Sequence, residues 1–323
     1  MAGKHSMSQS SLPLGQPEEP TPDPAPPEIM EQFSTAPSTS VAKLGLQKKR
    51  SSEQQAEVER IGQIEPFVGL ERDERLFTAL NQWRELGICA RVITIDRLGL
   101  AKSLKFYTHN HTKRRSGLLV TPSPVIYVEI EQHGCLTDLF VSIGEFLAHP
   151  FYSELLPQLR SRTLATLKSY KVKLLIINNA DMLSFAAFNE LIRIAEKLRI
   201  SVVLAGSPYL NEMLEPKGVK KNKYISIYNT FLKFHYYNVI NQEDLPTVIL
   251  EWEKKVGWSK PLKLWADKDI VATLGDASSG QLRALYENLR EIAAWKIDHP
   301  QAQSNSQNIS TALGRSYRPI SKL

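Results

Sequence analysis

Five short apolar runs, separated by segments of helical periodicity, constrain the fold of this chain more than any other feature. The runs are ARVITI (90–95), VIYVEI (125–130), KLLIIN (173–178), SVVLAG (201–206) and FLKFHYY (231–237). The clearest helical segment between them is FNELIRIAEKL (188–198), which carries an apolar stripe along one face. Strands that are apolar on both faces and alternate with helices are typical of a parallel sheet covered on both sides. The sequence therefore predicts an α/β domain from about residue 65 to about residue 240.

Beyond residue 242 the strand signals stop and helical spacing continues in three segments. These are EDLPTVILEWEKKV (243–256), DKDIVATLG (267–275) and SGQLRALYENLREIAAWKI (279–297). Eight of the nineteen prolines lie in residues 1–50, which cannot bury enough apolar surface to fold. We therefore predict a disordered Pro/Ser-rich tail (1–50), an α/β domain (51–241), a small all-α domain (242–297) and a polar, basic tail (298–323).

Charge and cysteine content limit the class of protein only loosely. The net charge of +6 is compatible with a polyanionic partner but does not require one. The two cysteines, Cys89 and Cys135, have no metal-ligand spacing, so we expect neither a zinc site nor a disulfide framework. No run is apolar and long enough to cross a bilayer, and the N-terminus has no signal-peptide core. We expect a cytoplasmic protein without membrane contact.

The stretch VKLLIINNADMLS (172–184) has the pattern of the strand that carries the acidic residues of a P-loop ATPase, but it ends in two amides. Magnesium prefers charged oxygen ligands, and the adjacent glutamate of such a site positions or deprotonates the attacking water. Asn178 offers only a neutral oxygen, and Asn179 cannot accept a proton. We expect both amides to end the strand and to hydrogen-bond neighbouring loops, so no catalytic residue is predicted here.

The turn after the first predicted strand, TIDRLGLAKSL (94–104), fails as a phosphate-binding loop in either register. Such a loop requires G-x-x-x-x-G-K-[ST], whose glycines let backbone N–H groups close on the phosphates. With Gly99 as the second glycine, Thr94 replaces the first glycine and the lysine position is lost. With Lys102 and Ser103 as the lysine and hydroxyl, Asp96 replaces the first glycine and brings a negative charge close to the phosphates.

The stretch KLLIINNADMLSFAAFNELIRIAEKLRISVVLAGSPYLNEML (173–214) resembles the TniB/TnsC-type AAA+ regulators of DNA transposition. The resemblance extends from about Leu76 to Ile297 and includes TDLF (137–140), RSRTLATLK (160–168) and LEWEKKV (250–256). It implies a P-loop NTPase (AAA+-like) fold, with a five-stranded parallel sheet and a small C-terminal all-α lid domain. It also implies ATP-dependent assembly on DNA, in rings or filaments that connect a target-selecting protein to the transposase.

Several positions that match the functional residues of this family depart from its pattern. Asp181 matches the second aspartate of the family's acidic strand, and we expect it to cap a helix. Ser207 matches the polar sensor residue after the fourth strand. No arginine lies between Tyr224 and Phe234, where the family places the residues that reach a neighbour's ATP. Together with the altered loop and strand, these departures predict a pseudo-ATPase that binds neither ATP nor magnesium.

We therefore expect a catalytically inactive adaptor or target-selection component of DNA transposition. Its partners would be an active TnsC/TniB-type ATPase, a TniQ-type targeting protein or the transposase, with self-assembly as a further option. One alternative is a divergent but active ATPase that uses Lys102, Ser103 and Asp181. Another is a protein that marks the insertion site by binding double-stranded DNA. The candidate DNA-binding residues lie in two basic clusters: Lys113, Arg114, Arg115, Lys217, Lys220, Lys221 and Lys223.

Overall fold

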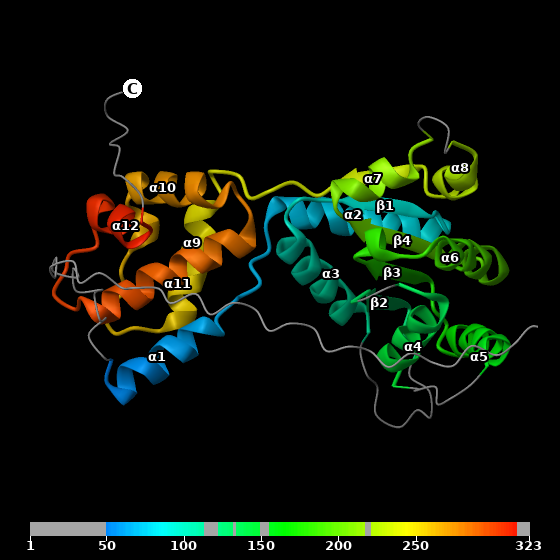
Figure 1. Ribbon diagram of the computed structural model, residues 1–323, viewed down its shortest axis with the longest axis horizontal. Helices are drawn as coiled ribbons and strands as arrows, with labels where there is room; N and C mark the ends of the chain where they lie inside the picture. The colour runs from blue at the N-terminus through cyan, green and yellow to red at the C-terminus, as the bar shows by residue number, and fades with distance from the viewer. Residues whose placement is uncertain (1–49, 113–121, 132–133, 149–154, 217–220, 315–323) are drawn as a thin grey trace, which may run out of the picture. The chain divides into compact units, whose positions relative to one another are not determined.

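The computed structural model describes residues 50–112, 122–131, 134–148, 155–216 and 221–314 (Figure 1). The chain divides into two units, residues 1–49 and 50–323, and everything below concerns the second. The predicted tail of residues 1–50 lies outside the described part except for its last residue. Within the described residues, no helix has the length and apolar content that crossing a membrane requires.

A five-stranded parallel sheet forms the centre of the α/β domain, as the sequence predicts. The strands follow the order β2-β3-β4-β1-β5, and every neighbouring pair is parallel. Each strand lies within one of the predicted apolar runs, and all residues of β1, β3 and β4 are buried because helices cover both of their faces. The strands are β1 (Ala90–Ile93), β2 (Val125–Glu129), β3 (Leu174–Asn178), β4 (Ser201–Gly206) and β5 (Lys233–Tyr236).

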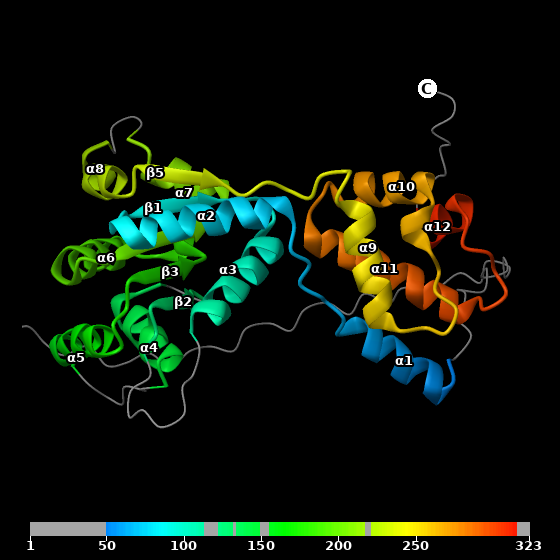
Figure 2. The same ribbon diagram turned by 180° about the vertical axis from the view of Figure 1, so that it is seen from behind.

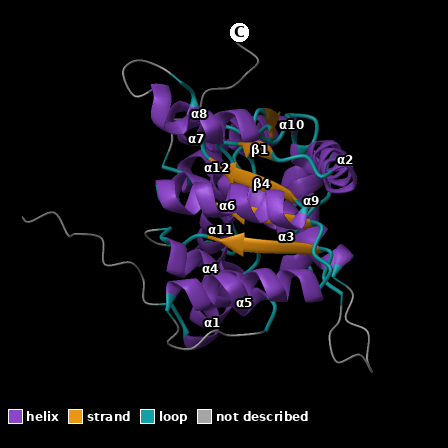
Figure 3. Cartoon of the chain, turned by 90° about the vertical axis from the view of Figure 1, so that its right-hand side faces the viewer, coloured by secondary structure: helices purple, strands orange, loops and turns teal. Residues whose placement is uncertain are grey.

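The helices cover the two faces of the sheet unequally, as Figure 3 shows with the strands seen between them. Side chains that alternate along a strand divide between two apolar clusters, so that Leu175 and Ile177 of β3 face one cluster while Leu174 and Ile176 face the other. Helices α2 (Glu71–Leu86) and α3 (Arg97–His111) cover one face. The other face carries α4 (Leu136–Phe146), α5 (Leu156–Ser169), α6 (Phe185–Leu198), α7 (Pro208–Leu214) and α8 (Lys221–Thr230).

A separate apolar cluster holds the helical domain together. Its largest fully buried side chains are Trp252 and Tyr286, from two of the three helical segments that the sequence predicts. The helices of this domain are α9 (Leu245–Val256), α10 (Lys268–Ser278) and α11 (Leu282–Asp298), with a short 3-10 turn, η3 (Leu264–Ala266), before α10.

Two further helices belong to this cluster, and they change the expected domain boundaries. Helix α1 (Ser52–Gly62) packs along α11, as the view in Figure 2 shows, and buries Ile61 among the side chains of the helical domain. Helix α12 (Ser306–Ala312) packs on α10 and α11 and buries Ile309 in the same cluster. The predicted assignment of residues after 51 to the α/β domain is therefore wrong for α1. The tail predicted from residue 298 is also wrong for α12, because one buried isoleucine docks each of these short helices on the helical domain.

Glu253 gives the helical domain a pH dependence that can be measured. Its side chain is 7% exposed and accepts hydrogen bonds from the N–H groups of Lys263 and Leu264, at 3.0 and 2.8 Å. Burial raises the pKa of this carboxyl above its ordinary value of 4.5 in spite of these bonds. The folded chain therefore holds the proton more tightly than the unfolded chain, and the stability due to Glu253 is lost as the pH rises through the raised pKa.

We expect Glu253→Gln to remove this loss, since glutamine does not ionise. The melting temperature of the variant minus that of the wild type should rise between about pH 4 and about pH 7. Thermal unfolding followed by circular dichroism across that range measures the difference. Glu251→Gln, at a more exposed carboxylate of the same helix, is the matched control. A difference for Glu253→Gln that falls with rising pH would contradict the assignment.

Candidate functional site

The candidate site lies at the edge of the sheet where the parallel strands end. Ligands of open α/β sheets bind outside the carboxyl ends of the strands, where the loops to the following helices meet. Here this edge gathers the turn from β1 to α3, the segment after β3 and the end of β4, and the start of α11 reaches it from the helical domain. These are the places where the sequence analysis put the degenerate nucleotide motifs.

The turn from β1 to α3 is too short for a phosphate cradle. Only Thr94, Ile95 and Asp96 separate the strand from the helix, whereas a P-loop places a G-x-x-x-x-G stretch between them. Thr94 closes the turn on its neighbours: its N–H donates to the carbonyl of Gly206 at 3.0 Å, and its Oγ1 donates to the carbonyl of Tyr237 at 2.8 Å. The same Oγ1 accepts the N–H of Asp96 at 2.9 Å. The N–H groups of Thr94 and Asp96 are thus already paired within the protein.

The carboxylate of Asp96 occupies the start of α3. It is 1% exposed, and its Oδ1 accepts the N–H of Gly99 at 3.1 Å within the first turn of the helix. The same oxygen accepts the N–H of Leu282, the first residue of α11, at 3.0 Å. Helix N-termini are ready-made anion sites because their first N–H groups are unpaired and their dipoles favour negative charge. Asp96 therefore acts as an internal anion between two helix N-termini.

Arg72 neutralises this internal anion. Its Nη1 lies 2.9 Å from Asp96 Oδ2 and 2.7 Å from the carbonyl oxygen of Asn238, and the arginine is only 8% exposed. Its guanidinium also lies over the ring of Tyr237, 4.6 Å from the centroid. A Cβ at Gly99 would lie 2.3 Å from Asp96 Oδ2, so the carboxylate fills the space above the helix start. The residues of this turn do not fit a triphosphate.

Lys102 and Ser103 make their hydrogen bonds away from the β1 to α3 turn. Helix α3 begins at Arg97, so both residues lie in its second turn rather than its first. Lys102 Nζ donates to the backbone carbonyl of Glu65 at 2.8 Å and lies 3.1 Å from its carboxylate. Ser103 is fully buried, donates to the carboxylate of Asp73 and lies 2.9 Å from the hydroxyl of Tyr237. Neither side chain reaches the turn at Asp96 by any hydrogen bond among the described residues.

A buried polar cluster thus forms beneath the turn, with Asp73 as its acceptor. Asp73 is 1% exposed and also accepts the phenol of Tyr237 at 2.8 Å and the N–H of Leu70 at 2.9 Å, which caps α2. Burial raises the pKa of Tyr237 far above its usual value, which keeps the phenol protonated as a donor. The sequence analysis missed Arg72 and Asp73, because charged residues in the first turn of a helix are usually solvated. It also missed Tyr237, which reaches Asp73 from the segment after β5.

The two amides at the end of β3 make hydrogen bonds to β2 and to the residue that follows it. Asn178 is 4% exposed, and its Nδ2 donates to the hydroxyl of Tyr127 at 2.9 Å and to Glu129 Oε1 at 3.3 Å. Asn179 adopts a positive φ of 55° and donates from Nδ2 to the carbonyl of Ile130 at 3.1 Å. Both amides therefore tie the end of β3 to β2, and neither is paired with a group of the β1 to α3 turn.

Asp181 departs from its expected role. It lies in the 3-10 turn η1 (Ala180–Met182), while the N-terminus of α6 is capped by Ser184, whose Oγ accepts the N–H of Ala187 at 3.3 Å. The helix-capping role predicted for Asp181 is therefore wrong. Its Oδ2 instead accepts Arg97 Nη2 at 2.6 Å and the hydroxyl of Ser207 at 2.9 Å. The structure thus joins two of the predicted positions, Asp181 and Ser207, across the ends of β3 and β4.

Most of the basic clusters lie outside the described residues. Lys113, Arg114, Arg115, Lys217 and Lys220 are in this group, and so is the side chain of Lys221. Lys223 is exposed on α8, with its Nζ 4.8 Å from the ring centroid of Phe185. No group of three or more potential metal ligands occurs within the described ranges.

Comparisons with known proteins agree with this architecture. Residues 78–214 match the family model of the AAA domain. The structure of Drosophila ORC bound to DNA is similar with a TM-score of 0.52 and 14% identity, over 90% of this chain and 70% of that chain. A Walker-type ATPase of Pyrococcus abyssi has a TM-score of 0.48 and 13% identity, over 77% of this chain and 73% of that chain. No curated protein matches the sequence.

The fold is therefore that of the AAA+ P-loop NTPases, which confirms the predicted fold class. The AAA-domain match covers the stretch from α2 to α7 and includes the turn at Asp96 and both amides after β3. At 14% identity, the likeness to the ORC structure supports the fold alone. The chemistry of the site has to be argued from its own residues.

Proposed function

We propose that this chain is a catalytically inactive AAA+ protein that serves as an adaptor or target-selection component in DNA transposition. The observation that carries the proposal is the Asp96 carboxylate, which lies between the N-termini of α3 and α11 and is paired with Arg72. The resemblance to TniB/TnsC-type regulators supports a role in DNA transposition. The internal anion provides the reason to expect no ATP chemistry.

Electrostatics opposes a nucleotide at this position. A phosphate at the start of α3 would meet a buried carboxylate whose counter-charge, Arg72, is already paired. Two like charges at about 4 Å repel by about 4 kcal/mol at an effective dielectric constant of about 20. Asn178 and Asn179 add no charge that could hold a magnesium ion to offset this repulsion. We infer that neither ATP nor magnesium is a cofactor of this chain.

A fixed arrangement of the two domains suits an adaptor. Two sets of polar contacts join them without a ligand: the bond from Leu282 N–H to Asp96, and the contacts of Glu65 with Lys102 of α3 and Arg290 of α11. An active AAA+ protein changes its assembly with its nucleotide. This chain would present the same surface to a targeting protein, a transposase or an active AAA+ regulator at all times.

A second candidate function is DNA binding at the insertion site. The Drosophila ORC structure of the same fold is bound to DNA, and Lys223 is an exposed cation on α8. Phosphate contacts of this kind give affinity that depends on salt and not on sequence. The third candidate, an ATPase that uses Lys102, Ser103 and Asp181, has less support because the hydrogen bonds of these three residues lead to different partners.

Calorimetric titration with Mg-ATP tests the inactive state. We expect no binding with a Kd below about 1 mM for the wild type. Binding in the micromolar range that is lost in Lys102→Ala would overturn the proposal and favour the divergent ATPase. Binding that survives Lys102→Ala would overturn it equally, by showing a nucleotide site elsewhere.

The adaptor role needs its own experiment. The chain is mixed with the transposase and an active AAA+ regulator of the same element, and the complex is measured by size-exclusion chromatography with and without ATP. We expect this chain to enter the complex in both conditions. Entry only with duplex DNA present, and binding to that duplex alone across a salt series, would favour the DNA-binding alternative.

A further inference from the structure

Strand β2 forms one edge of the sheet and leaves part of its backbone without partners. It pairs with β3 alone. The carbonyl of Pro124 accepts the N–H of Leu174 at 3.0 Å, and the N–H of Ile130 donates to Asn178 at 3.1 Å. Since backbone groups alternate in direction along a strand, those of Tyr127, Glu129 and Glu131 face away from β3.

These outward groups are open to a further strand. Among the described residues, the backbone N–H and C=O groups of Tyr127, Glu129 and Glu131 have no hydrogen bond beyond β2. Unpaired edge groups of this kind are a template for a strand from another chain. The stretch from residue 127 to residue 131 is about 13 Å long at the rise of a strand, which corresponds to about five residues of an added segment.

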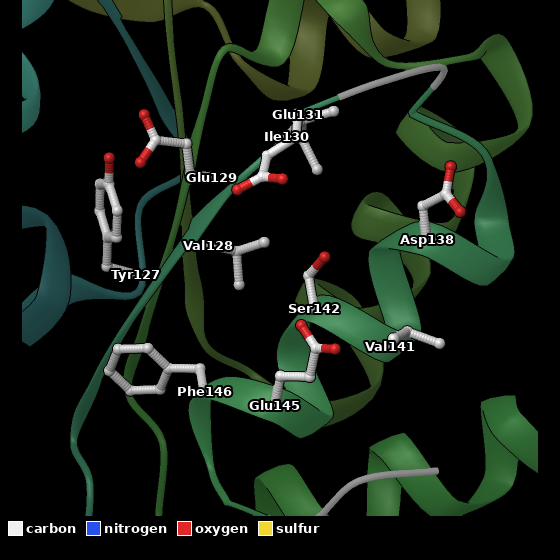
Figure 4. Close-up of a pocket in the computed structure, with 10 residues that line it drawn as sticks. All are labelled: Tyr127, Val128, Glu129, Ile130, Glu131, Asp138, Val141, Ser142, Glu145 and Phe146. Atoms are coloured by element: carbon white, nitrogen blue, oxygen red, sulfur yellow. The ribbon is translucent and has the colours of Figure 1, made fainter. Parts of the chain in front are cut away.

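A groove runs beside this edge, and helix α4 forms its second wall. The groove has a volume of about 400 Å³. Figure 4 shows Val128 pointing from the strand toward α4, and Ser142 and Glu145 pointing from the helix toward the strand. The residues that line the groove are Tyr127, Val128, Glu129, Ile130 and Glu131 from β2 and the segment after it, and Asp138, Val141, Ser142, Glu145 and Phe146 from α4. Of the strand residues, Val128 and Ile130 lie on the face of the sheet that α4 covers.

The groove is acidic, although the chain as a whole has a net charge of +6. Its four charged lining residues are all carboxylates: Glu129, Glu131, Asp138 and Glu145. Glu129 pairs with Lys105 at 2.9 Å, whereas the other three are exposed and have no ion pair within the described part of the chain. A ligand that carries positive charge is therefore favoured, and the phosphates of nucleic acid are repelled.

We propose that this groove binds an extended basic segment of a partner protein, which adds to the sheet beside β2. Its main chain would pair with the outward groups of Tyr127, Glu129 and Glu131. Lysine or arginine side chains on the alternate positions that face α4 would meet the exposed carboxylates of Asp138 and Glu145, and the intervening side chains would point to the opposite face of the sheet. The groove does not include the turn at Asp96, so this proposal does not depend on whether the chain binds nucleotides.

Fluorescence anisotropy with the full chain tests the charge requirement. The probe is a labelled peptide of about nine residues with alternating lysine and valine, which is long enough to span the edge. A peptide with glutamate in place of lysine is expected not to bind. Glu145→Lys should weaken binding of the basic peptide about tenfold by placing like charges together. Glu291→Lys, at an exposed position on α11, is the matched control and should bind as the wild type does.

The backbone requirement is tested by two variants of one residue. Glu131→Gln and Glu131→Pro both lose the carboxylate, but only proline also loses the outward N–H. We expect the proline variant to bind more weakly than the glutamine variant, with circular dichroism showing that both are folded. Equal binding by these two variants would overturn strand addition. No binding by the wild type or undiminished binding by Glu145→Lys would overturn the proposal as a whole.

Discussion

Replacing Asp96 with alanine is expected to lower the free energy of unfolding by about 3 to 5 kcal/mol. The change leaves Arg72 as a buried charge without its partner and leaves the N–H groups of Gly99 and Leu282 without an acceptor. A buried ion pair adds little compared with apolar packing, but removing one member of it is strongly destabilising. Urea unfolding followed by circular dichroism measures the loss.

Two controls separate the charge of Asp96 from its role as an acceptor. Asp96→Asn retains an oxygen for the two N–H groups and should lose less stability than the alanine variant. Formate, which supplies a carboxylate, should raise the melting temperature of Asp96→Ala but not that of the wild type. An alanine variant as stable as the wild type would show that the carboxylate does not hold the two helix N-termini together.

Replacing Asp73 with alanine is expected to cost about 3 kcal/mol or more, the second large effect. Asp73 is the acceptor for Tyr237, Ser103 and the N–H of Leu70, and all three donors lose it at once. Each buried donor left without a partner costs about 1 to 3 kcal/mol, and the loss of the helix cap adds to this. Chemical denaturation of the variant beside the wild type measures the difference.

Ser103→Ala is the informative comparison for this cluster. It removes one donor and leaves Asp73 with two others, so it should cost only about 1 kcal/mol. If Ser103 instead held a magnesium ion, its loss would lower affinity for ATP while leaving stability nearly unchanged. The pair of variants therefore distinguishes a structural hydroxyl from a catalytic one. A loss in Ser103→Ala as large as that in Asp73→Ala would contradict the central position of the carboxylate.

The sheet could be predicted from the sequence because its strands are apolar on both faces. Runs such as SVVLAG (201–206) coincide with β4, and β3 ends at Asn178, within the predicted run. The unfavourable charge of Asp96 was also visible in the sequence. Aspartate is a favoured N-cap, so the start of α3 at Arg97 had a local signal as well.

The contacts that surround Asp96 could not be predicted from the sequence, because the residues that bind its carboxylate come from distant segments of the chain. Arg72 lies in the first turn of α2, where charged residues are normally solvated, and its burial follows from tertiary packing. Leu282 reaches Asp96 from a position 186 residues further along the chain. Helices α1 and α12 were missed for a related reason: each gains its stability by docking on the helical domain.

Under the proposed function, the bond between Asp96 and the start of α11 is present in every state of the chain, unlike the contacts that a bound nucleotide makes. In a nucleotide switch, the anion between two helix N-termini is a bound nucleotide. The time that the protein spends in its bound state therefore depends on the rate of hydrolysis and on the supply of ATP. Here the anion belongs to the polypeptide and is made once, at synthesis. Because this carboxylate is part of the chain, it stays at the two helix N-termini at any protein concentration, and no reaction consumes it. We therefore expect that the disassembly of a complex containing this chain requires the activity of another protein in the complex.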